Sequence, residues 1–470
     1  MVANRIDTVA AAVAMTGAAE EAALPRRTLS VWDASAITIG IVIGAGIFQT
    51  PAMVAGVAGS LPLMLGVWIL GGVLSLIGAL TYAELATTYP STGGDYTFLT
   101  RAFGKHVSFL FAWARSTVIV TGSIALLGFI LGDYLTRLHS LGEHSAAIYA
   151  AAAVVLLTAV NLIGLKSSAR VQNVLTVIEV SGVLLVAIAG LLAGQPENFS
   201  TPATSNPGSI DSLGLALVFV LLTYGGWNEA AYVSAEVRGG ARAMVRTLVV
   251  SIVVITFIYV LFVAAAVYGL GLEGLQNSEA VGIQLMELAF GPAGAQLIGV
   301  IVAVAALTSM NSTMIVGARS NHAVGHHWPL LAFMSQWRDE HNIPAVGFLV
   351  QAAIALALVA LGAVEKNGFS TMVEFTAPVF WFFFMLSGIA LLVLRTREPH
   401  IARPFEAPAY PVLPLIFIVT CAYLFYSSIT YAQSQNAGYV ALGAMLSGAI
   451  ALAAMHYLGR TVLPWRDTRS

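Results

Sequence analysis

Apolar stretches of about 20 residues recur along the chain and are separated by short segments rich in Pro, Gly, Asn and charge. A stretch of that length crosses the hydrocarbon core of a bilayer as a helix. The pattern predicts twelve such helices, over residues 34–58, 62–86, 104–135, 146–165, 171–194, 212–236, 245–270, 293–317, 345–364, 372–394, 411–433 and 437–459. The sequence therefore predicts an all-α polytopic membrane protein.

The predicted helices fall into two halves and a remainder. Residues 34–194 and 212–394 each hold five of them, and residues 411–459 hold the last two. We expect one transmembrane domain over residues 29–460, with short tails at residues 1–28 and 461–470. The first tail is Ala-rich and mixed in charge, which is not typical of a signal peptide.

Positive charge alternates between successive loops. The N-terminal tail, every second loop and the C-terminal tail hold 18 of the 21 Lys and Arg residues. The intervening loops hold only Arg137 and Lys366, and Arg115 lies inside a predicted span. Because Lys and Arg are concentrated in cytoplasmic loops, we expect a cytoplasmic membrane protein with both termini in the cytoplasm.

Composition agrees with this class. The chain is 58% hydrophobic and 9% charged, whereas soluble domains carry about 25% charged residues. A net charge of −2 gives no indication of nucleic-acid binding. The single cysteine, Cys421, excludes an internal disulfide, and its apolar surroundings argue against a disulfide-linked partner subunit. No cofactor or metal site is expected.

Glycine interrupts two predicted helices at matching places. Residues 44–46 read GAG in the first span, and residues 224–228 read YGGWN in the sixth, about 180 positions further on. Close helix packing is one explanation, because small residues are common where membrane helices touch. Paired breaks in two halves of a chain are instead typical of the binding site of a secondary transporter.

Broken helices inside a bilayer have a chemical consequence. Lipid cannot satisfy their unpaired backbone groups, so these groups line a cavity or bind a ligand. N–H groups at the start of a half-helix suit a carboxylate, and C=O groups at the end of one suit an ammonium group. One site with both features suits a free α-amino acid.

Five motifs follow one another along the chain. Residues 43–48 read IGAGIF, residues 82–85 YAEL, residues 93–96 GGDY, residues 224–228 YGGWN and residues 403–405 RPF. In this order they resemble the amino acid–polyamine–organocation transporter superfamily, and within it the L-type amino-acid transporter branch. The resemblance covers about residues 30–430.

The resemblance implies a fold and a site. The fold would be that of the bacterial leucine transporter, with helices 1–5 and 6–10 as inverted repeats, helices 1 and 6 discontinuous, and helices 11 and 12 peripheral. The residues expected to bind the substrate or shape its pocket are Ile43, Gly44, Ala45, Gly46, Ile47, Thr223, Tyr224, Gly225, Gly226, Trp227 and Asn228.

Two positions depart from the branch pattern. Leu222 stands where relatives often carry a bulky aromatic gate, which implies a thinner gate. Asn228 stands where relatives with cationic substrates carry an acid, so the amide favours neutral substrates.

An acid lies deep in the fifth predicted span. Glu179 is about 12 Å from the span's start and stands where relatives keep a lysine. Burial favours the uncharged acid, so Glu179 could couple transport to protons. It could equally be a static buried partner, and a sodium site with Ser309 and Thr313 is a third interpretation. Arg115 has three interpretations too: it snorkels to the cytoplasmic side, lines the substrate exit or pairs with Glu179.

The predicted function is secondary active transport of amino acids by alternating access. Neutral L-amino acids are favoured, moved by proton symport or by exchange, so the expected partners are an amino acid, protons and the lipid bilayer. A polyamine or modified-amine carrier and a non-transporting amino-acid sensor are the alternatives. An enzyme is not expected, because the sequence shows no P-loop, nucleophile–base pair or metal cluster.

Overall fold

The computed structural model describes residues 30–90, 94–163, 169–199, 210–228, 238–336, 344–365, 367–435 and 437–457. The predicted tails at residues 1–28 and 461–470 lie outside the described residues. Within the described part, every element of regular secondary structure is a helix. This confirms the all-helical class that the apolar pattern predicted.

Ten helical stretches in the described part are long and apolar enough to cross a bilayer. They are α4 (Leu61–Thr88), the continuous run of α6 (Lys105–Ala114), η2 (Arg115–Ile119) and α7 (Val120–Leu138), α8 (Ser145–Leu162), α9 (Ala169–Ala193), α11 (Gly240–Gln276), α12 (Val281–His327), α13 (Ala345–Val364), α14 (Gly368–Arg397), α15 (Val412–Gln435) and α16 (Ala437–Tyr457). Each overlaps a predicted span. The largest difference is in α12, which begins twelve residues before the predicted start at residue 293 and is kinked at Gly291, where φ is +68°.

The other two predicted spans are broken. α2 (Val31–Val42) is followed by the short 3₁₀ helix η1 (Ala45–Phe48) and then by α3 (Thr50–Ala58). α10 (Ile210–Thr223) ends directly before the YGGWN motif, and residues 229–236 of that span lie outside the described residues. Both breaks therefore fall at the predicted glycine motifs, while the count of twelve spans and the inverted repeat remain predictions.

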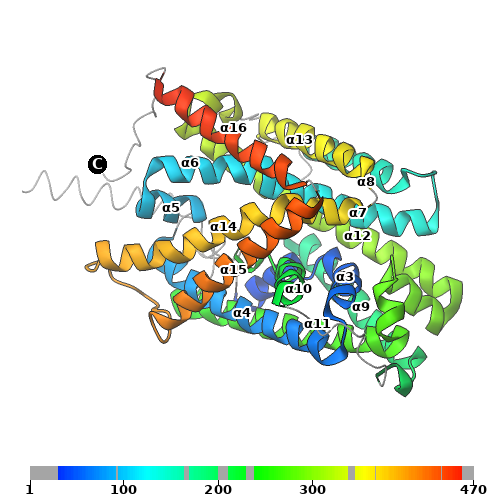
Figure 1. The fold of residues 1–470 in the computed structure, drawn as a ribbon. Helices are drawn as coiled ribbons and strands as arrows, with labels where there is room; N and C mark the ends of the chain where they lie inside the picture. The colour runs from blue at the N-terminus through cyan, green and yellow to red at the C-terminus, as the bar shows by residue number, and fades with distance from the viewer. Residues whose placement is uncertain are drawn as a thin grey trace, which may run out of the picture.

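The helices form one bundle, with the broken segments among the long helices (Figure 1). α2 packs against α9 and α11, and α10 packs against α3, α4 and α15. Helices that are remote in sequence thus enclose both breaks, so the exposed backbone groups there are kept away from lipid.

One end of the bundle, here called the basic end, carries Arg101, Arg395 and Arg403. The fully buried Glu84 at the end of α4 accepts hydrogen bonds from Arg395 at 2.7 and 2.6 Å and from Arg403 at 3.4 Å. The backbone N–H of Ala407 donates to the same carboxylate at 2.7 Å. A carboxylate with this many donors is fully satisfied despite its burial, and it joins α4 to α14 and the segment after it.

A second cluster at the basic end is centred on Glu398. Its carboxylate accepts hydrogen bonds from Tyr89 at 2.7 Å and from Arg101 at 3.1 Å. Burial and the bond to Glu398 raise the pKa of Tyr89 to about 12, so Tyr89 remains a neutral donor near pH 7. α5 (Asp95–Phe103) is thereby joined to the end of α14.

Candidate functional site

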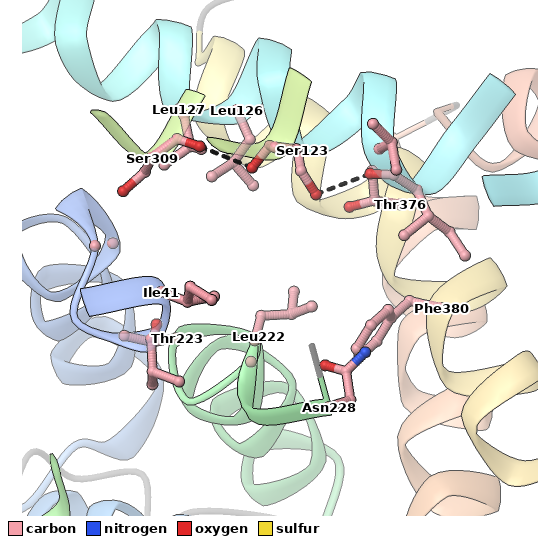
Figure 2. A pocket seen from close by; sticks show the side chains of 18 of the residues that line it. Ile41, Ser123, Leu126, Leu127, Leu222, Thr223, Asn228, Ser309, Thr376 and Phe380 are labelled. Carbon is pink, nitrogen blue, oxygen red and sulfur yellow. Dashed lines mark hydrogen bonds between the residues drawn. The ribbon is translucent and has the colours of Figure 1, made fainter. Parts of the chain in front are cut away.

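A cavity of about 270 Å³ lies between the two helix breaks and the helices α7, α12 and α14. Its volume is near the lower end for small-molecule sites. Figure 2 shows the breaks on one side and the three helices on the other, with the labelled residues Ile41, Leu222, Thr223, Asn228, Ser123, Leu126, Leu127, Ser309, Thr376 and Phe380. The cavity is therefore built where the sequence predicted a binding site.

Seven of the twelve residues expected to bind the substrate or to form its gate line this cavity. They are Gly44, Gly46, Leu222, Thr223, Gly225, Gly226 and Asn228. The other residues of the two motifs do not line it, and their side chains are at most 4% exposed: Ile43, Ala45, Ile47, Tyr224 and Trp227. Some residues of the two motifs therefore form the cavity wall, and the others are buried in the packing around it.

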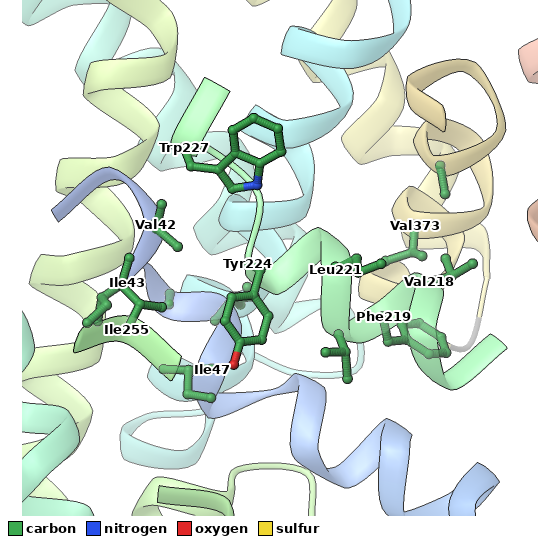
Figure 3. Packing of buried hydrophobic residues seen from close by; sticks show 14 of the residues in the cluster. Val42, Ile43, Ile47, Val218, Phe219, Leu221, Tyr224, Trp227, Ile255 and Val373 are labelled. Atoms are coloured by element: carbon green, nitrogen blue, oxygen red, sulfur yellow. The ribbon is translucent and has the colours of Figure 1, made fainter. Parts of the chain in front are cut away.

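Aromatic packing holds the second break in place. The Trp227 ring lies 5.2 Å from the Tyr82 ring and 5.6 Å from the Phe384 ring, centroid to centroid. The Tyr224 hydroxyl donates to the carbonyl of Trp68 at 3.0 Å. Figure 3 shows Tyr224 among buried residues of both breaks. These two aromatic side chains position the backbone rather than forming the cavity wall.

The hydroxyl of Tyr259 joins the two breaks. Tyr259 belongs to α11 and is fully buried, and its Oη lies 2.8 Å from the carbonyl oxygen of Val42 and 3.2 Å from that of Thr223. Val42 and Thr223 are the last residues of α2 and α10, so both carbonyls lack a partner inside their own helices. One hydroxyl proton is therefore shared between two helix ends.

Thr223 and Gly226 bring the breaks still closer. The Thr223 hydroxyl donates to the Thr50 hydroxyl at 2.7 Å, which links the end of α10 to the start of α3. Gly226 has φ +106°, and a Cβ there would lie 2.9 Å from Cγ2 and 3.3 Å from the carbonyl oxygen of Ile41. Only glycine fits this conformation and this contact comfortably.

Glu179 lies outside the cavity wall. It is 2% exposed, and neither carboxylate oxygen has a hydrogen-bond partner among the described residues. Thr176, three residues earlier on the same helix face, touches α2, because a Cβ at Gly40 would lie 2.0 Å from Thr176 Oγ1. Glu179 therefore lies on α9, close to the first break but outside the cavity wall.

Arg115 lines the cavity and is 7% exposed. It does not pair with Glu179, whose oxygens are unbonded in the described part of the chain. It also does not snorkel to solvent, as its burial shows. Arg115 is the first residue of the π-helical turn η2, a feature often found at functional sites.

Several residues of the site carry little or no signal in the sequence. Tyr259 stands in an uninterrupted apolar span, and nothing in that span marks its role. The aromatic run around Phe380, Phe383 and Phe384 is typical of lipid and helix packing, yet all three of these side chains line the cavity. Asp95 also lines it, fixed at 2.7 Å by the hydroxyls of both Tyr82 and Ser387. Of these residues, only Asp95 could have been found from the sequence, because it is the acid inside the GGDY motif.

Comparison with known proteins places this chain in a family. A family model described as amino acid permease matches residues 29–452. The chain belongs to the amino acid permease family. This confirms the resemblance to the amino acid–polyamine–organocation superfamily that the motifs indicated, and amino-acid transport is the activity of the family to which the chain belongs.

Individual permeases from distant organisms are similar over most of their length. The human cystine/glutamate transporter is 28% identical over 408 residues, which cover 85% of this chain and 79% of the relative. The Bacillus subtilis serine/threonine exchanger SteT is 25% identical over 399 residues, covering 84% and 89%. The mouse large neutral amino acids transporter small subunit 2 is 27% identical over 443 residues, covering 90% and 80%. Their names give different substrates, so similarity alone does not select one for this permease.

The Tyr259 bridge can be tested by removing one oxygen atom. In Tyr259→Phe, the Thr223 carbonyl loses its donor and the Val42 carbonyl keeps only the Gly44 N–H, at a cost of about 1–3 kcal/mol. We expect the apparent affinity for transported amino acid to fall by about tenfold, measured as the half-saturating concentration in proteoliposomes. Tyr149→Phe is the matched control, because its hydroxyl bonds the carbonyl of His139 away from the cavity. Equal affinities in wild type and Tyr259→Phe would contradict the role of the bridge.

The close approach at Gly226 predicts a second outcome. Gly226→Ala should reduce the initial rate of transport by about tenfold or more, because the new methyl group meets Ile41 and the positive φ is strained. Gly240→Ala shares the positive φ, +66°, but has nothing within 4 Å of the new Cβ. It should transport at nearly the wild-type rate. Equal losses in both variants would show that backbone strain alone, and not the contact, is responsible.

Proposed function

We propose that this permease is a secondary active transporter of neutral L-amino acids, working by alternating access in the cytoplasmic membrane. Both termini would lie in the cytoplasm, so the basic end would face the cytoplasm. Transport would proceed by proton symport or by exchange. The observation on which the proposal rests is that one small cavity is bordered by the ends of two broken helices and by the start of a third.

The backbone of an amino acid fits this border chemically. The N–H groups at the start of η1, next to Gly44 and Gly46, are free of intrahelical bonds by helix geometry and suit the carboxylate. The carbonyls that end α2 and α10 suit the ammonium group. Each carbonyl oxygen has two lone pairs. The Val42 oxygen already accepts from Tyr259 and from the Gly44 N–H, both at 2.8 Å. The Thr223 oxygen accepts from Tyr259 and can accept from a ligand as well.

The rest of the cavity wall supports a neutral side chain. Leu222 and Phe380 supply apolar surface, and Asn228 supplies an uncharged amide. A carrier of polyamines would need several acids along such a wall, whereas Asp95 is the one carboxylate among the described lining residues. The amino acid is therefore favoured over the polyamine as substrate.

Glu179 supports the proton alternative for coupling. A buried carboxylate without a donor is costly when ionised, and α9 places it against α2, whose break forms part of the cavity. Gaining or losing a proton there would change the charge beside the segment that binds substrate.

The function is tested by counterflow in proteoliposomes made with the purified protein. Vesicles loaded with unlabelled neutral amino acids should accumulate labelled neutral amino acids at least about tenfold faster than labelled cationic amino acids or amines. The reason is that a ligand with an additional charge finds no partner for that charge in the proposed site. Vesicles without protein serve as the control for leak. Accumulation of amines without any amino acid would support the polyamine carrier and overturn this proposal.

Coupling is tested with Glu179→Gln. An inward proton gradient should stimulate uptake by wild type but not by the variant, while counterflow by the variant continues. Glu374→Gln is the matched control, since Glu374 is also a buried glutamate, 4% exposed, outside the cavity wall. If wild type ignores the gradient, or Glu179→Gln keeps the full response, Glu179 does not couple protons to transport.

A further inference from the structure

The charged side chains on the cavity wall are few and of opposite sign. Among the described residues that line the cavity, only Asp95 and Arg115 have charged side chains. The two are 3% and 7% exposed, so both are largely removed from bulk water. The remaining described wall consists of apolar, glycine, hydroxyl and amide residues.

The two charged residues come from different elements. Asp95 begins α5, and its carboxylate accepts hydrogen bonds from hydroxyls on α4 and α14. Arg115 begins the π-helical turn between α6 and α7. Because both residues border the same cavity, a ligand inside it lies in the field of each.

We propose that Asp95 and Arg115 together set the charge specificity of the cavity. This inference rests on the proposed function and adds to it the residues that exclude amino acids with charged side chains. A cationic side chain is attracted by Asp95 and repelled by Arg115, and an anionic side chain is repelled by Asp95 and attracted by Arg115. Neither gain offsets the cost of removing the extra charge from water, so net-neutral amino acids are selected.

The magnitude follows from Coulomb's law. For charges about 8 Å apart at an effective dielectric constant of about 20, one interaction changes affinity by about 30-fold. Removing Asp95 makes the wall more positive by one charge, and removing Arg115 makes it more negative by one. Selectivity between anionic and cationic ligands should then shift in opposite directions in the two variants, which a purely structural role would not produce.

The experiment measures competition in proteoliposomes. Uptake of a labelled neutral amino acid is inhibited with glutamate and with lysine, and the ratio of their inhibition constants is determined. Asp95→Asn, in which the amide oxygen can still accept from Tyr82 and Ser387, should shift this ratio about tenfold or more in favour of glutamate. Arg115→Gln should shift it by a similar factor in favour of lysine.

Further variants isolate charge from structure. The double variant Asp95→Asn/Arg115→Gln should return to the wild-type ratio, because the two charge changes cancel. Arg115→Lys keeps the charge and should keep the ratio. If Arg115→Gln does not fold, Arg115→Met removes the same charge and should shift the ratio in favour of lysine. Arg137→Gln, whose ion pair with Glu279 lies outside the cavity wall, should also leave the ratio unchanged.

The outcomes separate this inference from the proposed function. Neutral uptake with an unchanged ratio in both single variants would overturn the role of the pair and leave the proposed function intact. A shift in the same direction in both variants would overturn it too. If wild type takes up no amino acid, the proposed function fails first, and this inference fails with it.

Discussion

One buried hydroxyl group bridges the ends of the two broken helices. α2 and α10 each end in a carbonyl that has no partner in its own helix, and such groups are costly inside a bilayer. Tyr259 reaches both carbonyls from α11, which packs against α2 and α4. The distance between the two breaks, and with it the shape of the cavity, therefore depends on Tyr259 together with the Thr223–Thr50 hydrogen bond and the close approach of Gly226 to Ile41.

Around this bridge the other contacts have distinct tasks. Trp227 and Tyr224 fix the backbone of the second break against the surrounding rings, and the lack of a side chain at Gly226 lets that backbone meet Ile41. At the basic end, Glu84 fixes the ends of α4 and α14 with arginine partners. The cavity is thus supported at its centre by neutral hydrogen bonds and at a distance by ion pairs.

Much of the architecture could be predicted from the sequence, because a bilayer imposes simple rules. A span needs about 20 apolar residues, so helix positions followed from hydropathy, and breaks required glycine, which located them at residues 44–46 and 225–226. The cavity wall was harder. Phe380 and Tyr259 lie in apolar helices, where a residue facing the cavity and one facing lipid look alike in sequence. The positions of Trp227 and Glu179 relative to the cavity could not be predicted either, because they depend on which helix each side chain contacts, and tertiary packing sets those contacts.

The central claim is that the breaks recognise both charged groups of an amino acid backbone. The most direct measurement is the affinity of purified protein, by isothermal titration calorimetry, for its preferred amino acid and for that compound's decarboxylated and deaminated analogues. Each missing group removes a charge-assisted interaction worth about 1.5–3 kcal/mol, so each analogue should bind at least about tenfold more weakly. An amine that binds as tightly as the amino acid would contradict recognition of the carboxylate at the first break, and with it this account of the site.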